Sequence, residues 1–394
     1  MDAAEFAIGA VAVSFAIALA ALIPAVLRLA ILPAVVLEIL FGVAIGPQGM
    51  GLVHHNEILD VLSELGLAIL FLIAGLEINP GQVRGAPTQL ALRGWVLSLA
   101  IGLVLGFGGQ ALGLFSGGGF VAIAIATTAI GALMPILKDA GLLAPPYGPF
   151  VLASGAVGEA LPLVALSLAL AGVAGFGTQS VVLVLFAATG LLAIALAGRI
   201  RQLPLPPLFH ETMSSSGQFP IRFAVFLTIS FALFGQSLGL DLVLGAFVAG
   251  AVLRTLLPED LHDDLMQRLS AVGYGFLIPI FFVTSGTELD IAALAGSQTA
   301  IALVPVFVLM MLIARGVPVL ILFRGVLGIR QRIALAFHSA TQLPLVVAIA
   351  AIAVEQGAMP GWCGASLVVA GVVTVIVFPG LAALALKTGG TRSG

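Results

Sequence analysis

Two charged residues lie inside long apolar stretches of the chain. Glu159 stands in ASGAVGEALPLVAL (153–166) and Arg315 stands in LMMLIARGVPVLIL (309–322). A charge at the centre of a membrane helix costs about 2.5 to 3.5 kcal/mol on insertion scales, so each needs a reason. A carboxylate that water reaches binds either a proton or a small cation, and desolvation and a nearby guanidinium pull its proton affinity in opposite directions. The pair therefore predicts a site where a cation and a proton compete; a structural salt bridge that fixes helix register is the alternative.

Three other polar residues in apolar surroundings are weaker candidates. Glu38 is an accessory candidate, with a structural or interface role as its alternative, and Ser154 is a second accessory candidate. His338 is a candidate site residue, and its alternative is a hydrogen-bonded histidine of the core. A lone histidine cannot hold a metal, and no catalytic, phosphate-loop or metal-ligand motif stands in a suitable context. We therefore expect neither an enzyme nor a bound metal or cofactor.

The composition places the chain in a lipid bilayer. Of its 394 residues, 61% are hydrophobic and 8% are charged, whereas a soluble domain carries about 25% charged residues. So small a charged fraction argues against a nucleic-acid partner. The single Cys363 excludes an internal disulfide. The start MDAAEF holds no basic residue, so we expect the first apolar segment to be a retained membrane helix and not a signal peptide.

Apolar segments divide the chain into membrane spans, because about 20 apolar residues cross the hydrocarbon. We expect an all-α integral membrane protein of about 13 transmembrane helices, forming a single transporter domain over residues 1–394. The second span is short and the fourth is long, which predicts tilt or a break in them. The expected spans are 6–27, 30–46, 58–78, 89–114, 119–137, 149–172, 178–198, 219–236, 241–256, 272–287, 299–323, 332–354 and 362–385.

Basic residues predict the orientation of these spans. Short cytoplasmic loops collect Lys and Arg, and here the basic residues follow the odd-numbered spans, while Arg315 falls inside a span. We therefore expect the N-terminus outside and the C-terminus in the cytoplasm, in a cell membrane such as the bacterial inner membrane. The basic residues of the odd connections are Arg28, Arg84, Arg93, Lys138, Arg199, Arg201, Arg222, Arg254, Arg268, Arg324, Arg330, Arg332, Lys387 and Arg392. The acids of the even connections are Glu57, Asp241, Glu288, Asp290 and Glu355.

Two pairs of segments predict an internal repeat. FLIAGLEIN (71–79) resembles FFVTSGTELD (281–290), and Ala126-Thr127 corresponds to Ala340-Thr341. In both pairs the two segments are separated by nearly the same number of residues. This predicts that spans 1 to 6 (about 1–172) and spans 8 to 13 (about 219–386) are copies of one another. Copies that begin seven spans apart start on opposite sides of the membrane, so the repeat is inverted, as in transporters that alternate access about a midplane site. The loop 199–222 is the expected joint.

Spans 5 and 12 are the candidates for two crossed, discontinuous helices. Both combine polar side chains with proline at a similar depth, and such transporters interrupt a pair of helices near the membrane midplane. The alternative is that the hydroxyl groups bond to carbonyls one turn earlier in unbroken helices. The residues concerned are Thr127, Thr128 and Pro135 in span 5, and Thr341, Gln342 and Pro344 in span 12.

Five motifs, in this order, resemble those of the monovalent cation:proton antiporters. The motifs are GVAIGPQGMGL (42–52), LSELGLAILFLIAGLEI (62–78), ATTAIGALMPILKDAGLL (126–143), IPIFFVTSGTELD (278–290) and RIALAFHSATQLPLVVAIAAIAVEQG (332–357). Together they cover nearly the whole chain and are most similar to the second cation:proton antiporter family. That family includes sodium/proton exchangers and the membrane part of glutathione-gated potassium efflux systems.

The resemblance implies a fold and a set of site residues. The fold is a core domain with two crossed, interrupted helices beside a dimerisation domain, so a homodimer is expected. The activity is exchange of Na⁺ or K⁺ for protons by alternating access. The family carries Asp-Asp or Asn-Asp in span 6, and Gly158 and Glu159 occupy those places, which makes Glu159 the shared ion and proton site. Its basic residue in span 11 matches Arg315, and its polar stretch in the first crossing helix matches Thr127 and Thr128.

Departures from the family pattern leave two other functions open. Gly158 removes the first polar residue of the pair, Glu is longer than Asp, and TQLP (341–344) replaces an Arg-Gly-Glu-like stretch. One titratable acid predicts electroneutral exchange, and no glycine-rich nucleotide-binding module is expected after span 13. The alternatives are a sodium-coupled carrier of organic anions on a related fold, and a membrane sensor or complex subunit that does not transport.

Overall fold

The chain is helical throughout the part that the computed structural model describes. That part comprises residues 3–27, 33–54, 56–77, 85–173, 178–200, 212, 217–237, 242–289 and 291–387, and it contains no strand. Nine of its helical stretches are long and apolar enough to cross a membrane. The predicted all-α membrane fold is confirmed. The expected joint at 199–222 lies largely outside the described residues, as do Arg28, Arg84, Asp241 and Asp290.

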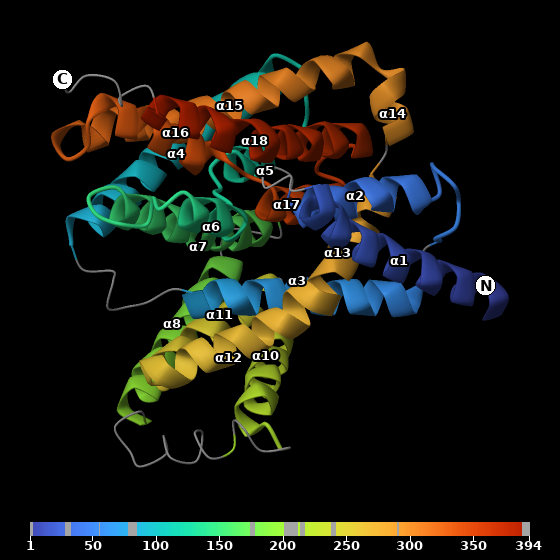
Figure 1. The fold of residues 1–394 in the computed structure, drawn as a ribbon, viewed down its shortest axis with the longest axis horizontal. Coiled ribbons are helices and arrows are strands. Elements are labelled where there is room, and N and C mark those ends of the chain that lie inside the picture. The colour runs from blue at the N-terminus through green and yellow to red at the C-terminus, as the bar shows by residue number, and fades with distance from the viewer. Residues whose placement is uncertain are drawn as a thin grey trace. The chain divides into compact units, whose positions relative to one another are not determined.

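The described residues form two compact units, and unit 1 comprises Met1–His55, Val83–Pro162 and Phe282–Gly394. Its elements are α1 (Ala3–Leu27), α2 (Ala34–Ile45), α4 (Ala86–Ala111), α5 (Gly118–Ala124), α6 (Ile130–Asp139), the first part of α7 (Gly148–Val173), most of α13 (Ile278–Glu288), α14 (Ile291–Gly296), α15 (Gln298–Leu322), the 3₁₀ turn η2 (Phe323–Gly325), α16 (Ile329–Ala340), α17 (Pro344–Glu355) and α18 (Gly361–Lys387). Within this unit α15, α16 and α18 pack on one another (Figure 1), and α4 packs on α5 and α15.

Unit 2 comprises Asn56–Gln82 and Leu163–Phe281. Its elements are α3 (Glu57–Glu77), the rest of α7, α8 (Thr178–Ile200), α10 (Phe219–Ser237), α11 (Leu242–Leu256), α12 (Glu259–Val272) and the π-helical turn η1 (Gly273–Leu277). Helix α11 packs on α3, α8 and α10 and so lies at the centre of this unit.

The helix expected at 272–287 begins much earlier than predicted. It starts as α12 at Glu259, so Arg268, which was expected in a loop, lies within a helix. The reason is that α12 is amphipathic: Leu261, Leu265 and Leu269 recur every four residues and are buried, which places them on one helix face. Charged residues on the other face lowered the apparent hydropathy and concealed this helix from a search for apolar segments.

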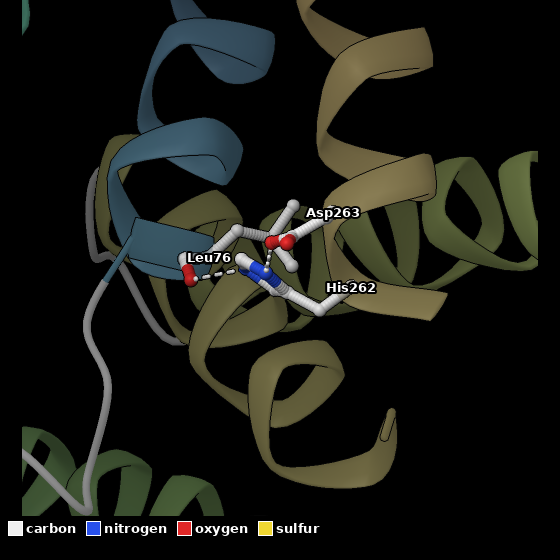
Figure 2. Close-up of polar contacts among 3 residues, drawn as sticks. All are labelled: Leu76, His262 and Asp263. Atoms are coloured by element: carbon white, nitrogen blue, oxygen red, sulfur yellow. Dashed lines mark hydrogen bonds and ion pairs between the residues drawn. The ribbon is translucent and has the colours of Figure 1, made fainter. Parts of the chain in front are cut away.

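A histidine of α12 joins this helix to the end of α3 (Figure 2). The Nε2 atom of His262 lies 3.1 Å from the carbonyl oxygen of Leu76, and its Nδ1 atom lies 3.1 Å from Oδ1 of Asp263. Both partners are acceptors, so the ring donates to both when both nitrogens carry a proton. Leu76 belongs to the last turn of α3, whose carbonyls lack intrahelical donors. His262 therefore caps α3 from a neighbouring helix.

Both crossing helices are interrupted, as predicted. The first stops at Ala124 and resumes at Ile130, and the second stops at Ala340 and resumes at Pro344. Pro344 begins α17, where a missing N–H costs nothing. The expectation that Pro135 marks the first break is wrong, because Pro135 lies inside α6. There the backbone leaves the helix earlier, since the N–H groups at 128 and 129 bond to other segments.

Four glycines form the same helix crossing twice. In unit 1, a Cβ on Gly42 of α2 would overlap the carbonyl of Val283, and a Cβ on Gly286 of α13 would overlap that of Ile39. In unit 2, Gly75 of α3 faces the carbonyl of Phe247 and Gly250 of α11 faces that of Leu72 in the same way. In each pair, each glycine lies against the carbonyl of the residue three positions before the other glycine. Gly75 and Gly286 are also the glycines of the two similar segments, as an internal repeat predicts.

Substitution of a crossing glycine by alanine should separate the two backbones. For Gly250→Ala we expect the free energy of unfolding to fall by about 1 to 3 kcal/mol, because the new methyl group would overlap the carbonyl of Leu72. Thermal unfolding of the detergent-solubilised protein measures this. The matched control is Gly108→Ala in α4, where nothing lies within 4 Å of the new carbon, and it should be neutral or slightly stabilising. Equal stability of both variants would contradict the crossing.

Candidate functional site

The two interrupted helices meet at their unwound segments, 125–129 and 341–343. The N–H of Ala129 donates to the carbonyl of Thr341 at 2.8 Å, and Nε2 of Gln342 donates to the carbonyl of Ile125 at 2.9 Å. Ile125 directly follows α5, so the Gln342 amide satisfies a carbonyl that the end of α5 leaves without an intrahelical donor. The breaks are therefore stabilised by one another. They place two helix N-termini and two helix C-termini around one point inside unit 1.

The guanidinium of Arg315 lies beside this crossing and is buried, with 4% of the residue exposed. Its Nη2 donates to Oγ1 of Thr128 at 2.7 Å and to the carbonyl of Ser154 at 3.2 Å. Its Nε donates to Oγ1 of Thr128 at 3.1 Å and to the carbonyl of Ser339 at 3.3 Å, and its Nη1 donates to Oγ of Ser98 at 3.2 Å. These acceptors are neutral hydroxyl and carbonyl oxygens from four segments of the chain.

Gly158 gives Arg315 its place against α7. A Cβ on this glycine would lie 2.5 Å from Oγ1 of Thr128 and 2.8 Å from Nη2 of Arg315, closer than real Cβ contacts allow. The absence of a side chain at position 158 is therefore what admits the guanidinium. Glu159 is the next residue of α7 and is half-buried. The structure thus brings the arginine against Gly158, the residue before Glu159.

The two threonines of the first break play different roles. Oγ1 of Thr127 donates to the carbonyl of Ala124 at 2.8 Å, which is the local back-bond considered as an alternative from the sequence. Thr128 instead reaches across to the second crossing helix, where its Oγ1 donates to the carbonyl of Ser339 at 2.7 Å. Thr341 bonds back to Phe337 within α16, at 3.0 Å. Only some of the predicted polar residues therefore form contacts between helices.

The remaining candidates lie in different surroundings. Nδ1 of His338 is 2.7 Å from the hydroxyl of Tyr147, whose ring belongs to a buried apolar cluster of unit 1. Ser154 contributes its backbone carbonyl to Arg315. Glu38 is buried on α2, one turn before Gly42, where α2 crosses α13. Glu38 therefore belongs to the glycine crossing of unit 1.

Sequence reasoning missed three residues of this region. Ser98 interrupts the apolar run WVLSLAIG of α4, and that interruption was a detectable signal. Ser339 precedes the second break and acts through its carbonyl, which no sequence pattern reveals. Oγ1 of Thr374 in α18 accepts from the N–H of Gln342 at 3.0 Å, and its single proton faces the carbonyls of Gly371 at 2.7 Å and Gln342 at 3.0 Å. It therefore supplies the acceptor that the unwound N–H of Gln342 needs.

A many-span helical protein with two crossed, interrupted helices has the fold of a secondary transporter. A sequence model described as "Sodium/hydrogen exchanger, transmembrane" matches residues 15–388. The chain belongs to this family.

Known proteins similar to this chain agree with that membership. A Bacillus subtilis protein, YjbQ, provisionally named an Na⁺/H⁺ antiporter, is 29% identical over 87% of this chain and 57% of its own length. The Na⁺/H⁺ antiporter of Enterococcus hirae is 28% identical over 64% of this chain and 66% of its own length. The chain thus spans less than two thirds of either relative. A solved structure of the sodium proton antiporter MjNhaP1 from Methanocaldococcus jannaschii shares the fold, with a TM-score of 0.72, 15% identity, and coverage of 97% of this chain and 99% of that one.

Loss of the Arg315 guanidinium should destabilise the crossing. In Arg315→Gln the hydroxyls of Thr128 and Ser98 and the carbonyls of Ser154 and Ser339 lose a charged donor, and a hydrogen bond to a charged group contributes about 1.5 to 3 kcal/mol. We therefore expect a clear drop in thermal stability in detergent. Arg330→Gln, at an exposed position near the start of α16, is the matched control and should melt like the unmodified protein. An Arg315→Gln protein as stable as this control would show that the hydrogen bonds contribute little.

Proposed function

We propose that the protein exchanges a monovalent cation, Na⁺ or K⁺, for protons by alternating access, with Glu159 as the shared binding site. The observation that carries this proposal is the buried Arg315 fixed against α7 at Gly158, one residue before a half-buried carboxylate. Family membership supports it, as do relatives named Na⁺/H⁺ antiporters.

The chemistry follows from one carboxylate in α7 and one positive charge that is fixed at the preceding residue, Gly158. Glu159 neutralises Arg315 when it is ionised, and it can give up that role to bind a cation or a proton. The two ligands compete for the same oxygens, so their binding is mutually exclusive. The crossed helix ends add partial charges of both signs nearby. Arg315 bonds to neutral oxygens, so its charge remains available to balance the empty site.

Glu159→Gln should abolish exchange, because a neutral amide has no carboxyl proton to release and no negative charge for which a proton and a cation could compete. The measurement is the collapse of an imposed pH gradient by Na⁺, K⁺ or Li⁺ in proteoliposomes, followed with a pH-sensitive dye. Glu159→Asp should retain part of the activity. Glu355→Gln, the same chemical change at the exposed end of α17, should behave like the unmodified protein.

The same assay separates the rival functions. Full cation-dependent gradient collapse by Glu159→Gln would remove the proposed role of Glu159. Uptake of an organic anion that depends on a sodium gradient, without proton counterflow, would favour the carrier. No flux of any solute by a correctly folded protein would favour the sensor or subunit.

We further propose a topology and an assembly. The distribution of basic residues supports an external N-terminus and a cytoplasmic C-terminus in a cell membrane, such as the bacterial inner membrane. The family resemblance supports a homodimer. Labelling of single cysteines introduced near each end, from either side of the membrane, tests the orientation. Cross-linking in native membranes tests the dimer.

A further inference from the structure

Thr128 connects three segments through one side chain and its own backbone. Its N–H donates to the carbonyl of Gly158 at 3.0 Å, which ties the first break to α7. Its hydroxyl donates to the carbonyl of Ser339 at 2.7 Å, which ties it to α16. The same oxygen accepts from Nη2 of Arg315 at 2.7 Å and from Nε at 3.1 Å, which ties it to α15. No other hydroxyl contact described above joins so many elements.

These contacts use the full bonding capacity of the hydroxyl. A threonine hydroxyl has one proton to donate and two lone pairs to accept with. The proton goes to Ser339, and the two lone pairs face Nε and Nη2 of Arg315. A transported cation would have to displace the guanidinium to use this oxygen. The contacts thus favour a role through Arg315 over direct binding of the ion.

The position of Arg315 depends on Thr128 and on the missing side chain at Gly158. The site of a Cβ at 158 lies 2.8 Å from Nη2 of Arg315 and 2.5 Å from Oγ1 of Thr128, so both groups fill that space. The other acceptors are more distant: the carbonyls of Ser339 and Ser154 at 3.3 and 3.2 Å, and Oγ of Ser98, which binds Nη1 at 3.2 Å. Thr128 is therefore the side chain that fixes the charge against α7.

We propose that Thr128 is a positioning residue that sets how tightly Glu159 holds its proton, by holding the Arg315 guanidinium at Gly158, and that it is not a ligand of the transported cation. The proposal rests on the exchange function proposed above. The guanidinium is held at Gly158, one residue before Glu159, and a nearby positive charge favours the ionised form of a carboxylate. A loosened guanidinium lets Glu159 retain its proton to higher pH, so protons compete better with the cation.

Few other ionisable groups belong to the elements that Thr128 and Arg315 join. Among the described residues, Glu159 and Arg315 are the only charged side chains of α7 and α15. α16 adds His338, whose Nδ1 faces the hydroxyl of Tyr147. The other charged residues of α4, α6, α16 and α17 are Arg93, Lys138, Asp139, Arg330, Arg332 and Glu355. Arg315 is thus the charge whose place Thr128 controls.

The test is the apparent KM for Na⁺ of Thr128→Val, measured in proteoliposomes across a range of pH. On the acidic side we expect KM to rise by about three- to tenfold, since up to one pH unit of altered proton binding corresponds to tenfold competition. At alkaline pH, where Glu159 is ionised in both proteins, KM should converge on that of the unmodified protein. Thr128→Ser retains the hydroxyl and should restore the original pH profile.

A ligand role predicts a different pattern. If Thr128 binds the cation, Thr128→Val raises KM by the same factor at every pH, and that result would overturn the proposal. An unchanged KM at every pH would overturn it as well. The matched control is Thr228→Val in α10, a buried threonine whose hydroxyl bonds to its own helix at Ala224, and it should keep the original profile.

A second variant keeps the test decisive if Thr128→Val does not fold. Ser98→Ala removes the hydroxyl that accepts from Nη1 of Arg315, so it should produce the same pH-dependent rise in KM, but a smaller one. A rise that does not depend on pH, or no rise, would count against the proposal. Glu159→Gln serves as the separate reference. Activity in that variant would refute the exchange site itself, whereas inactivity there with an unaltered Thr128→Val profile would refute only the role of Thr128.

Discussion

Backbone polar groups inside a membrane must find hydrogen-bond partners within the protein, because lipid offers none. An unbroken helix meets this condition by itself, and a broken helix does not. The crossing of unit 1 meets it with a small set of side chains. The Gln342 amide donates to the end of α5, Thr374 accepts from the N–H of Gln342, and Arg315 donates to the end of α16 at Ser339. The arrangement of the site follows from this constraint.

The same constraint explains why the charge of Arg315 is bound by neutral oxygens. Carbonyls near a helix C-terminus carry partial negative charge and favour a cation. Ser339 provides such a carbonyl, and the guanidinium has enough donors to serve Thr128, Ser98 and Ser154 as well. Arginine presents several donors in a fixed plane, whereas lysine offers a single charged nitrogen. Arg315 therefore joins four segments through hydrogen bonds and leaves a net positive charge at Gly158.

The sequence was sufficient to predict the parts of the fold that depend on apolar length and on symmetry. The broken spans followed from paired polar residues, and the burial of Arg315 followed from the cost of a charge in lipid. The start of α12 could not be predicted in this way. Its exposed acids lower the mean hydropathy of the segment more than the buried leucines 261, 265 and 269 raise it. Nor could the role of Pro135 be judged, since the first break is fixed by tertiary bonds at 128 and 129. The different hydrogen bonds of Thr127 and Thr128 could not be predicted either, because a sequence does not show which of two adjacent threonines contacts another helix.

The paired glycine crossings have a consequence for how the protein forms during synthesis. Helix α2 meets α13, and α3 meets α11, so each crossing takes one helix from each half of the chain. The ribosome must therefore produce about 170 to 240 further residues before the early helices meet their partners, judged from the sequence separations of the glycines. Until then the glycine-containing faces of the early helices contact lipid or chaperones. Insertion and final packing are consequently separated in time, and neither half can complete its own interior alone.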